Sequence, residues 1–113
     1  MTIYALSTGS GIAGVAIIRV SGPEAANVVK SLTQQEIPTP IMATLKKINN
    51  INTSELIDEG IIIWFPSTES YTGEDMAEIH IHGSKAVITA VQNEISKLKN
   101  CRLAEPGEFT KLA

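Results

Sequence analysis

The sequence of 113 residues contains one cysteine, Cys101, and few aromatic residues, which make up 4% of the chain. A single thiol excludes an internal disulfide framework of the kind that stabilises small secreted domains. The longest apolar runs, such as residues 61–65, are much shorter than the roughly 20 residues of a membrane-spanning helix. The first residues also lack the basic and apolar regions of a secretory signal peptide. These absences predict a cytoplasmic protein that makes no contact with a membrane.

An excess of basic residues is missing as well. Nine lysines and arginines stand against twelve aspartates and glutamates, which gives a net charge of -3 and a pI near 5.3. Binding to a phosphate backbone usually requires a basic surface, so we do not expect this segment to contact nucleic acid directly. The 43% of hydrophobic residues is ordinary for one globular domain with its own core.

The order of the expected elements predicts the fold class. Apolar and β-branched runs predict strands over residues 3–7, 15–20, 42–48, 57–65, 76–82 and 101–103. Helices are expected to begin near residues 21–25 and 83–85, and residues 106–113 resemble a turn followed by the start of a helix in a longer protein. This order predicts an α+β fold, with a mixed β-sheet and helices packed mainly on one face.

Two helices carry sequence signals at their starts. Ser21, Pro23 and Glu24 form the pattern of a capping box, in which a serine side chain caps the helix and an acid follows three residues later. Ser84 is the expected cap of the second helix. Each helix has one apolar stripe, formed by Ala25, Val28, Val29 and Leu32 in the first and by Val87, Ile88, Val91, Ile95 and Leu98 in the second.

The strand predicted over residues 76–82 carries three polar side chains at alternate positions. Alternation places Glu78, His80 and His82 on one face and three apolar side chains on the other, which indicates a ligand site on the polar face. One carboxylate and two imidazoles suit zinc or iron, but further ligands are not apparent in the sequence. The alternative is that one or both histidines are ordinary surface or core residues with hydrogen-bonded ring nitrogens.

Arg19 is the one charged residue in the apolar run from residue 15 to residue 20. A buried guanidinium without a partner would be unfavourable by several kcal/mol, so a partner is expected. One explanation is that Arg19 forms an internal ion pair with Glu78 or Glu74. The other is that Arg19 faces a pocket and binds an anionic ligand group by forked hydrogen bonds. The sequence alone favours neither explanation.

Two further patterns have ordinary structural explanations. Residues 9–14 match the letters of a dinucleotide-binding glycine pattern, but a β-branched strand follows where that site needs the start of a helix. A glycine-rich turn is therefore expected. Cys101 has no obvious base nearby in the sequence, so a packed or surface thiol is favoured over a nucleophile.

Several motifs in one order resemble the amino-terminal domain of the MnmE (TrmE) family of tRNA-modification GTPases. They are IIRVSGP at residues 17–23, DEG at 58–60, WFP at 64–66, YTGED at 71–75, EIHIHG at 78–83 and RLAEPGEFTK at 102–111. The resemblance covers nearly the whole chain. It departs from the family in the glycine-rich turn after Thr8 and at Gly83-Ser84, where the family commonly has two glycines.

The resemblance implies a fold akin to the folate-binding domain of aminomethyltransferases. Residues 1–113 would be a single folate-binding and dimerisation domain, which binds 5-formyltetrahydrofolate or 5,10-methylenetetrahydrofolate and forms a homodimer. Arg19 and Glu78 match the arginine and the acidic residue of the family's folate site, and a further basic site residue would follow Ala113. The resemblance assigns no catalytic residue and no metal ligand to this segment.

The complete protein implied by the resemblance contains a GTPase domain that binds GTP, magnesium and potassium outside this segment. Together with an FAD-dependent partner enzyme, such a hydrolase modifies the wobble uridine of tRNA. Whether this segment is itself an enzyme is left open by the sequence. The alternative function is a freestanding α+β domain that senses a small molecule without catalysis.

Overall fold

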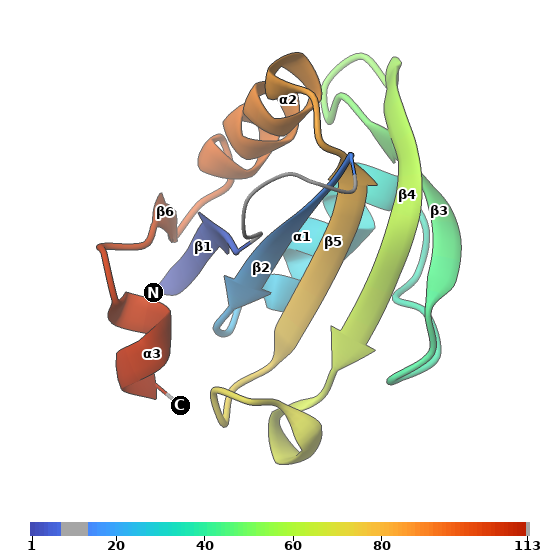
Figure 1. The fold of residues 1–113 in the computed structure, drawn as a ribbon. Helices are drawn as coiled ribbons and strands as arrows, with labels where there is room; N and C mark the ends of the chain where they lie inside the picture. The colour runs from blue at the N-terminus through green and yellow to red at the C-terminus, as the bar shows by residue number, and fades with distance from the viewer. Residues whose placement is uncertain (8–13, 113) are drawn as a thin grey trace.

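Within residues 1–7 and 14–112, which the computed structural model describes, six strands form one sheet (Figure 1). The spatial order of the strands is β3-β4-β5-β2-β1-β6. Their bounds are β1 Thr2–Leu6, β2 Val15–Ser21, β3 Thr44–Asn49, β4 Leu56–Phe65, β5 Met76–His82 and β6 Cys101–Leu103. Neighbours are antiparallel except β1 and β6, which are parallel. The predicted mixed sheet is therefore confirmed.

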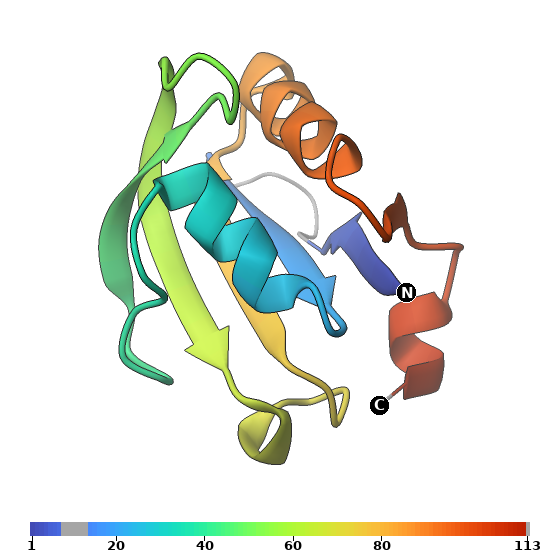
Figure 2. The same cartoon turned by 180° about the vertical axis from the view of Figure 1, so that it is seen from behind.

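Two helices, α1 (Ala25–Thr33) and α2 (Lys85–Ser96), cover one face of this sheet. The short α3 (Glu108–Leu112) lies near the first residue at the β6 edge (Figure 1). In Figure 2, α1 and α2 lie in front of the strands, where α1 packs on β2, β3 and β5 and α2 on β4, β5 and β6. No helix in the described part of the chain is long and apolar enough to span a membrane. The expected α+β class is confirmed.

The core lies between the sheet and these two helices. Alternate side chains of the strands point into it, because successive residues of a strand face opposite sides of the sheet. Fully buried residues come from both layers: Ile18, Val20, Ile62, Ala77 and Ile79 from the sheet, and Val28, Val29, Leu32, Val91 and Ile95 from the helices. We call the other side of the sheet, which carries Arg19, Glu78 and His80, the open face.

The start of α2 agrees with its sequence signal. The side chain of Ser84 accepts a hydrogen bond of 3.2 Å from the backbone N–H of Val87, so the serine caps the first turn. Val91 and Ile95 of the predicted apolar stripe are buried, and Val87, Ile88 and Leu98 pack against the core.

The capping box predicted for α1 is wrong. The helix begins at Ala25, and no side chain caps it. Ser21 belongs to β2, and its hydroxyl lies 2.7 Å from the hydroxyl of Thr72. The N–H of Glu24 instead donates to the hydroxyl of Thr2, at 2.7 Å. Hydroxyl partners from distant parts of the chain thus replace the local bonds that the sequence pattern predicts.

One glycine allows β4 and β5 to approach closely. A Cβ atom built on Gly60 would lie 2.1 Å from the carbonyl oxygen of His80, a distance that no side chain tolerates. Glycine is therefore required at this position of β4, because any larger residue would push the backbone of β5 away. The position of His80 in the sheet depends on this contact.

We expect Ile79→Ala to lower the free energy of unfolding by about 2–5 kcal/mol, because it leaves a cavity in the buried core. Leu56→Ala is the matched control, since Leu56 is 57% exposed at the start of β4, and it should change stability by less than about 1 kcal/mol. Urea unfolding followed by the fluorescence of Trp64, the single tryptophan, measures both values. Similar losses in the two variants would contradict this description of the core.

Candidate functional site

Arg19 and Glu78 lie directly opposite each other on the open face. In the antiparallel register, Arg19 of β2 pairs with Glu78 of β5, and the flanking strands place Ala5 and Ile63 in the same row. The Nε of Arg19 donates to Oε2 of Glu78 at 3.1 Å. Of the two explanations for Arg19 that the sequence left open, the ion pair with Glu78 is confirmed, whereas Glu74 bonds the hydroxyl of Ser21.

The second oxygen of Glu78 has a different partner. Its Oε1 lies 3.0 Å from Nε2 of His80, the next residue along the same face of β5. The side chains of Glu78 and His80 are 15% and 24% exposed, so both are largely shielded by their neighbours. Arg19, Glu78 and His80 therefore form one connected polar group in the middle of the open face.

A hollow of about 440 Å³ lies beside this group. Arg19, Leu6 and Tyr71 line one side of it. Residues 103–110 line the other side, which we call the outer wall. Its volume lies in the range of about 300–1,000 Å³ that is typical of small-molecule sites. Arg19 thus both pairs with an acid and faces a pocket, so the two explanations that the sequence offered are compatible.

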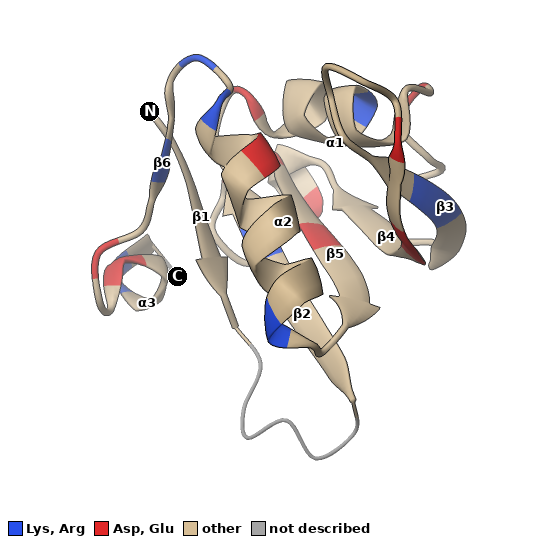
Figure 3. Ribbon diagram, turned by 90° about the horizontal axis from the view of Figure 1, so that it is seen from above, with Lys and Arg blue, Asp and Glu red and all other residues tan. Residues whose placement is uncertain are grey.

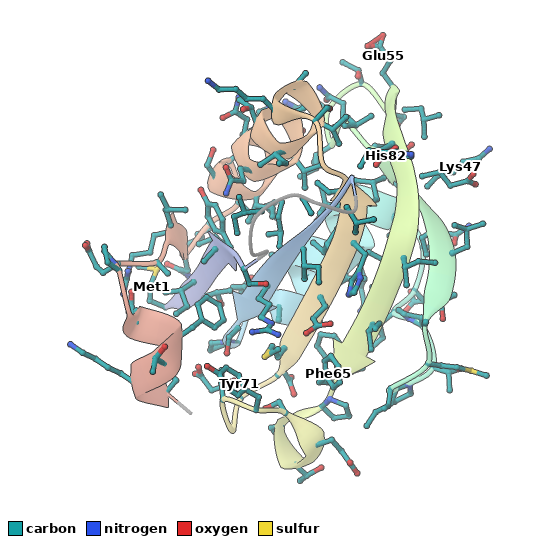
Figure 4. All side chains as sticks on the ribbon, viewed as in Figure 1. Met1, Lys47, Glu55, Phe65, Tyr71 and His82 are labelled. Atoms are coloured by element: carbon teal, nitrogen blue, oxygen red, sulfur yellow. The ribbon has the colours of Figure 1, made fainter. Side chains whose placement is uncertain are left out.

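Tyr71 contacts both Arg19 of the sheet and Phe109 of the outer wall. The guanidinium of Arg19 lies over the ring of Tyr71, 5.5 Å from the ring centroid, which is a cation–π contact. The hydroxyl of Tyr71 donates to the backbone carbonyl of Phe109 at 3.3 Å, and Figure 4 shows the side chain beside α3. Sequence reasoning did not single out Tyr71 as a site residue, because its partners are distant in the chain.

An ion pair holds the outer wall in shape. Arg102 donates from Nη1 to Oε1 of Glu108 at 2.8 Å and from Nη2 to Oε2 at 2.5 Å. Glu108 also accepts from the backbone N–H of Glu105 at 2.8 Å. The hydrogen bonds from Arg102, followed by the bond from Glu105, lower the pKa of Glu108 to about 2. The sequence presented these residues only as part of a family motif.

His82 belongs to a separate pair at the other end of β5. Its Nδ1 lies 2.7 Å from Oδ1 of Asp58, and its backbone N–H donates to Oδ2 at 2.9 Å. Burial favours a higher pKa for Asp58, but these bonds outweigh burial, so the pKa of Asp58 is lowered. Figure 4 shows His82 and Tyr71 at opposite ends of the sheet.

The metal site considered for Glu78, His80 and His82 receives no support from this arrangement. Glu78 and His80 bond to each other, whereas His82 bonds to Asp58. Across residues 1–7 and 14–112, no group of three or more His, Cys, Asp or Glu side chains is placed to hold a metal ion.

The remaining sequence candidates are structural. Cys101 packs against the hydrophobic core, and burial together with the charge of Glu24 raises the pKa of its thiol, which does not favour a nucleophile. Residues 8–13 of the glycine-rich pattern lie outside the described residues, but the strand predicted after it is β2. Basic and acidic segments alternate over the described elements, without a continuous basic stripe (Figure 3).

The sequence matches a known protein family over nearly its whole length. The family model described as GTP-binding protein TrmE N-terminus matches residues 2–113. The chain is 72% identical to the tRNA modification GTPase MnmE of Pelagibacter ubique, over 100% of this chain and 26% of the relative. It is 49% identical to the mitochondrial 5-taurinomethyluridine-[tRNA] synthase subunit GTPB3 of Danio rerio, over 99% of this chain and 22% of the relative. The chain thus spans about a quarter of the length of these relatives.

The outer wall should respond to acid in a way that follows from the lowered pKa of Glu108. The ion pair with Arg102 stabilises the wall fully above the ordinary glutamate pKa of 4.5, and this contribution is lost as the pH falls through about 2. NMR shifts of residues 109–111, which follow Glu108 in α3, should therefore keep their neutral-pH values near pH 4. In Glu108→Gln they should differ from the wild type even at neutral pH.

Glu36→Gln is the control for this experiment, because it removes a carboxylate from a surface ion pair away from the outer wall. The Glu36 side chain is 89% exposed, and its Oε1 lies 3.7 Å from Nζ of Lys30. This substitution should leave the shifts of residues 109–111 unchanged. A midpoint near pH 4.5 for those shifts in the wild type would contradict the role given to the ion pair.

Proposed function

This chain belongs to the TrmE N-terminus family, and from that premise we propose that it is the tetrahydrofolate-binding, homodimerising amino-terminal domain of a GTPase that modifies the wobble uridine of tRNA. The observation that carries the proposal is that Arg19 lines a hollow of about 440 Å³ while its Nε pairs with Glu78, which lies next to Arg19 but is not one of the residues that line the hollow. The ligand is 5-formyltetrahydrofolate or 5,10-methylenetetrahydrofolate, which supplies the one-carbon unit when bound.

The chemistry of the hollow suits a reduced folate. Such a ligand combines a polar bicyclic ring, an aromatic linker and an anionic glutamyl tail. The hollow offers the cation of Arg19, the ring of Tyr71 and the apolar side chains of Leu103 and Phe109, and Glu105 and Glu108 also line it. Small-molecule sites combine apolar surface with polar groups that orient the ligand, and this mixed lining provides both.

Glu78 and Arg19 have complementary roles toward the pterin ring in this proposal. The ring presents a 2-amino group beside a ring N–H, and an ionised carboxylate such as Glu78 accepts from both donors at once. The ring carbonyl follows that N–H directly. Because Arg19 and Glu78 touch each other, Arg19 reaches this neighbouring carbonyl through its Nη donors, while its Nε keeps Glu78 in place.

In this proposal, GTP binding and tRNA modification need parts of the complete protein that lie outside this chain. The relatives named above are a tRNA modification GTPase and a subunit of a tRNA-modifying synthase, and this chain spans only about a quarter of them. GTP, magnesium and potassium would bind in the GTPase domain. The FAD-dependent partner enzyme and the tRNA would be engaged by the full-length protein, and this domain contributes the folate site and the dimer contact.

The open face supplies the dimer contact in this proposal. Val15 and Leu45 are 42% and 61% exposed there, and with Ile61, His80 and His82 they line a shallow hollow of about 280 Å³. Exposed apolar side chains that gather on one surface are typical of protein interfaces. A second copy of this chain is the partner that the family resemblance implies.

We expect Glu78→Ala in the full-length protein to lower the affinity for 5-formyltetrahydrofolate at least about tenfold, because charge-assisted hydrogen bonds to the pterin are lost. Isothermal titration calorimetry measures this loss. Glu55→Ala is the matched control, because Glu55 lies at the exposed turn between β3 and β4, far from Tyr71 (Figure 4), and should bind as the wild type does. Unchanged affinity in Glu78→Ala would refute the assignment.

The dimer contact has its own test. Leu45→Lys should shift the protein toward the monomer in sedimentation experiments, because a charge would be buried at the interface between the copies. Leu56→Lys introduces the same charge at another exposed leucine and should leave the dimer intact. Dissociation by Leu56→Lys alone would place the interface elsewhere.

A further inference from the structure

Glu78 is held from two directions. One oxygen accepts from Arg19 on the neighbouring strand at 3.1 Å, and the other lies 3.0 Å from Nε2 of His80 on its own strand. A carboxylate bonded at only one oxygen can rotate about its last side-chain bond. Bonds to both oxygens fix the plane of the group, and therefore the directions of its remaining lone pairs.

The sheet fixes the position of His80 in turn. His80 stands in register with Ile17 on β2 and with Ile61 on β4, so its ring is flanked by apolar side chains on both sides. The close approach of Gly60 to the His80 carbonyl holds the backbone at this point. The position of His80 is thus defined. Neither His80 nor Glu78 lines the hollow beside Arg19, and His80 instead borders the shallow hollow of about 280 Å³.

The bond between His80 and Glu78 also indicates which ring nitrogen of His80 carries a hydrogen. An ionised carboxylate only accepts hydrogen bonds, so Nε2 of His80 carries the hydrogen in this contact. As a hydrogen-bond donor to one oxygen, His80 orients the carboxylate of Glu78 and leaves its other lone pairs able to accept from a ligand.

We propose that His80 is a positioning residue, which acts through Glu78 to set the affinity and the selectivity of the site for the two-donor edge of a reduced pterin. This inference rests on the proposed function, because it needs a ligand that Glu78 contacts. It gives a role to a histidine that the sequence alone left as either a metal ligand or an ordinary hydrogen-bonded residue. Without His80, Glu78 keeps one bond and loses its fixed plane.

Two substitutions of similar polarity separate this role from a general effect on folding. The amide nitrogen of glutamine occupies a place close to Nε2 of histidine, whereas the shorter asparagine cannot reach Glu78. His80→Asn should therefore lower the affinity for 5-formyltetrahydrofolate about tenfold, and His80→Gln should stay within about threefold of the wild type. Calorimetric titration of the full-length protein measures both, and the fluorescence of the buried Trp64 reports that each variant is folded.

His82→Gln is the matched control. His82 lies two residues further along the same face but bonds to Asp58, so this substitution should leave the affinity unchanged. Equal losses in His80→Asn and His82→Gln would overturn the inference, because they would indicate a general disturbance of β5.

A double-mutant cycle tests whether His80 acts through Glu78. In a Glu78→Gln background, His80→Asn should cause no further loss of affinity, because the group that His80 orients is already changed. The same tenfold loss in both backgrounds would overturn the inference.

Selectivity supplies a further readout. The wild type should prefer 5-formyltetrahydrofolate about tenfold over an analogue in which a methyl group replaces the 2-amino group, and His80→Asn should lose most of this preference. A preference retained in His80→Asn would contradict the role of His80. Absence of folate binding by the wild type would overturn the proposed function, whereas wild-type binding with unchanged affinity in His80→Asn would overturn this inference alone.

Discussion

The antiparallel register between β2 and β5 is the constraint on which the candidate site depends. It places Arg19 opposite Glu78 on the open face. On the opposite face of the same two strands, Ile18 pairs with Ile79, and both are fully buried. A slip of one residue would turn the polar set into the core and the apolar set into solvent, so the hydrophobic effect fixes the register and thereby the site.

The ion pair between Arg19 and Glu78 orients groups more than it stabilises the fold. The Arg19 side chain is 34% exposed, and partly exposed ion pairs contribute little to the free energy of folding. Its importance lies in the donors and acceptors that it leaves in place. Arg19 uses Nε for Glu78, stacks over Tyr71 and faces the hollow, so one side chain connects the sheet, the wall and the space between them.

The sequence predicted those parts of the structure that depend on local patterns. Alternation along β5 separated Glu78 and His80 from the apolar face, and the isolated charge of Arg19 predicted a partner, which is Glu78. The capping box at Ser21 failed because hydroxyl groups from Thr72 and Thr2 compete with the local bonds. A local pattern predicts a local bond only where no distant group offers a better one.

The outer wall could not be predicted in the same way, because its contacts join residues that are distant in the chain. Tyr71 and Phe109 are separated by 38 positions, and no periodic pattern indicates that a tyrosine hydroxyl meets a particular carbonyl. The ion pair of Arg102 and Glu108 spans only six positions, but its residues form no helical or strand repeat. The motif was recognisable only as part of a family resemblance.

The two sides of the hollow are therefore stabilised by different interactions. We call the side formed by Arg19 and the sheet the floor, and the other side is the outer wall. Arg19 is part of a sheet whose strands share the buried core, whereas α3 has five residues, none of them buried. An isolated helix of that length is marginal in water, so the wall depends on the Arg102–Glu108 pair and the bond from Tyr71. A ligand that contacts both sides would stabilise the wall more than the floor, since only the wall can unfold without the core. Part of its binding free energy would then be used to hold α3 against the sheet.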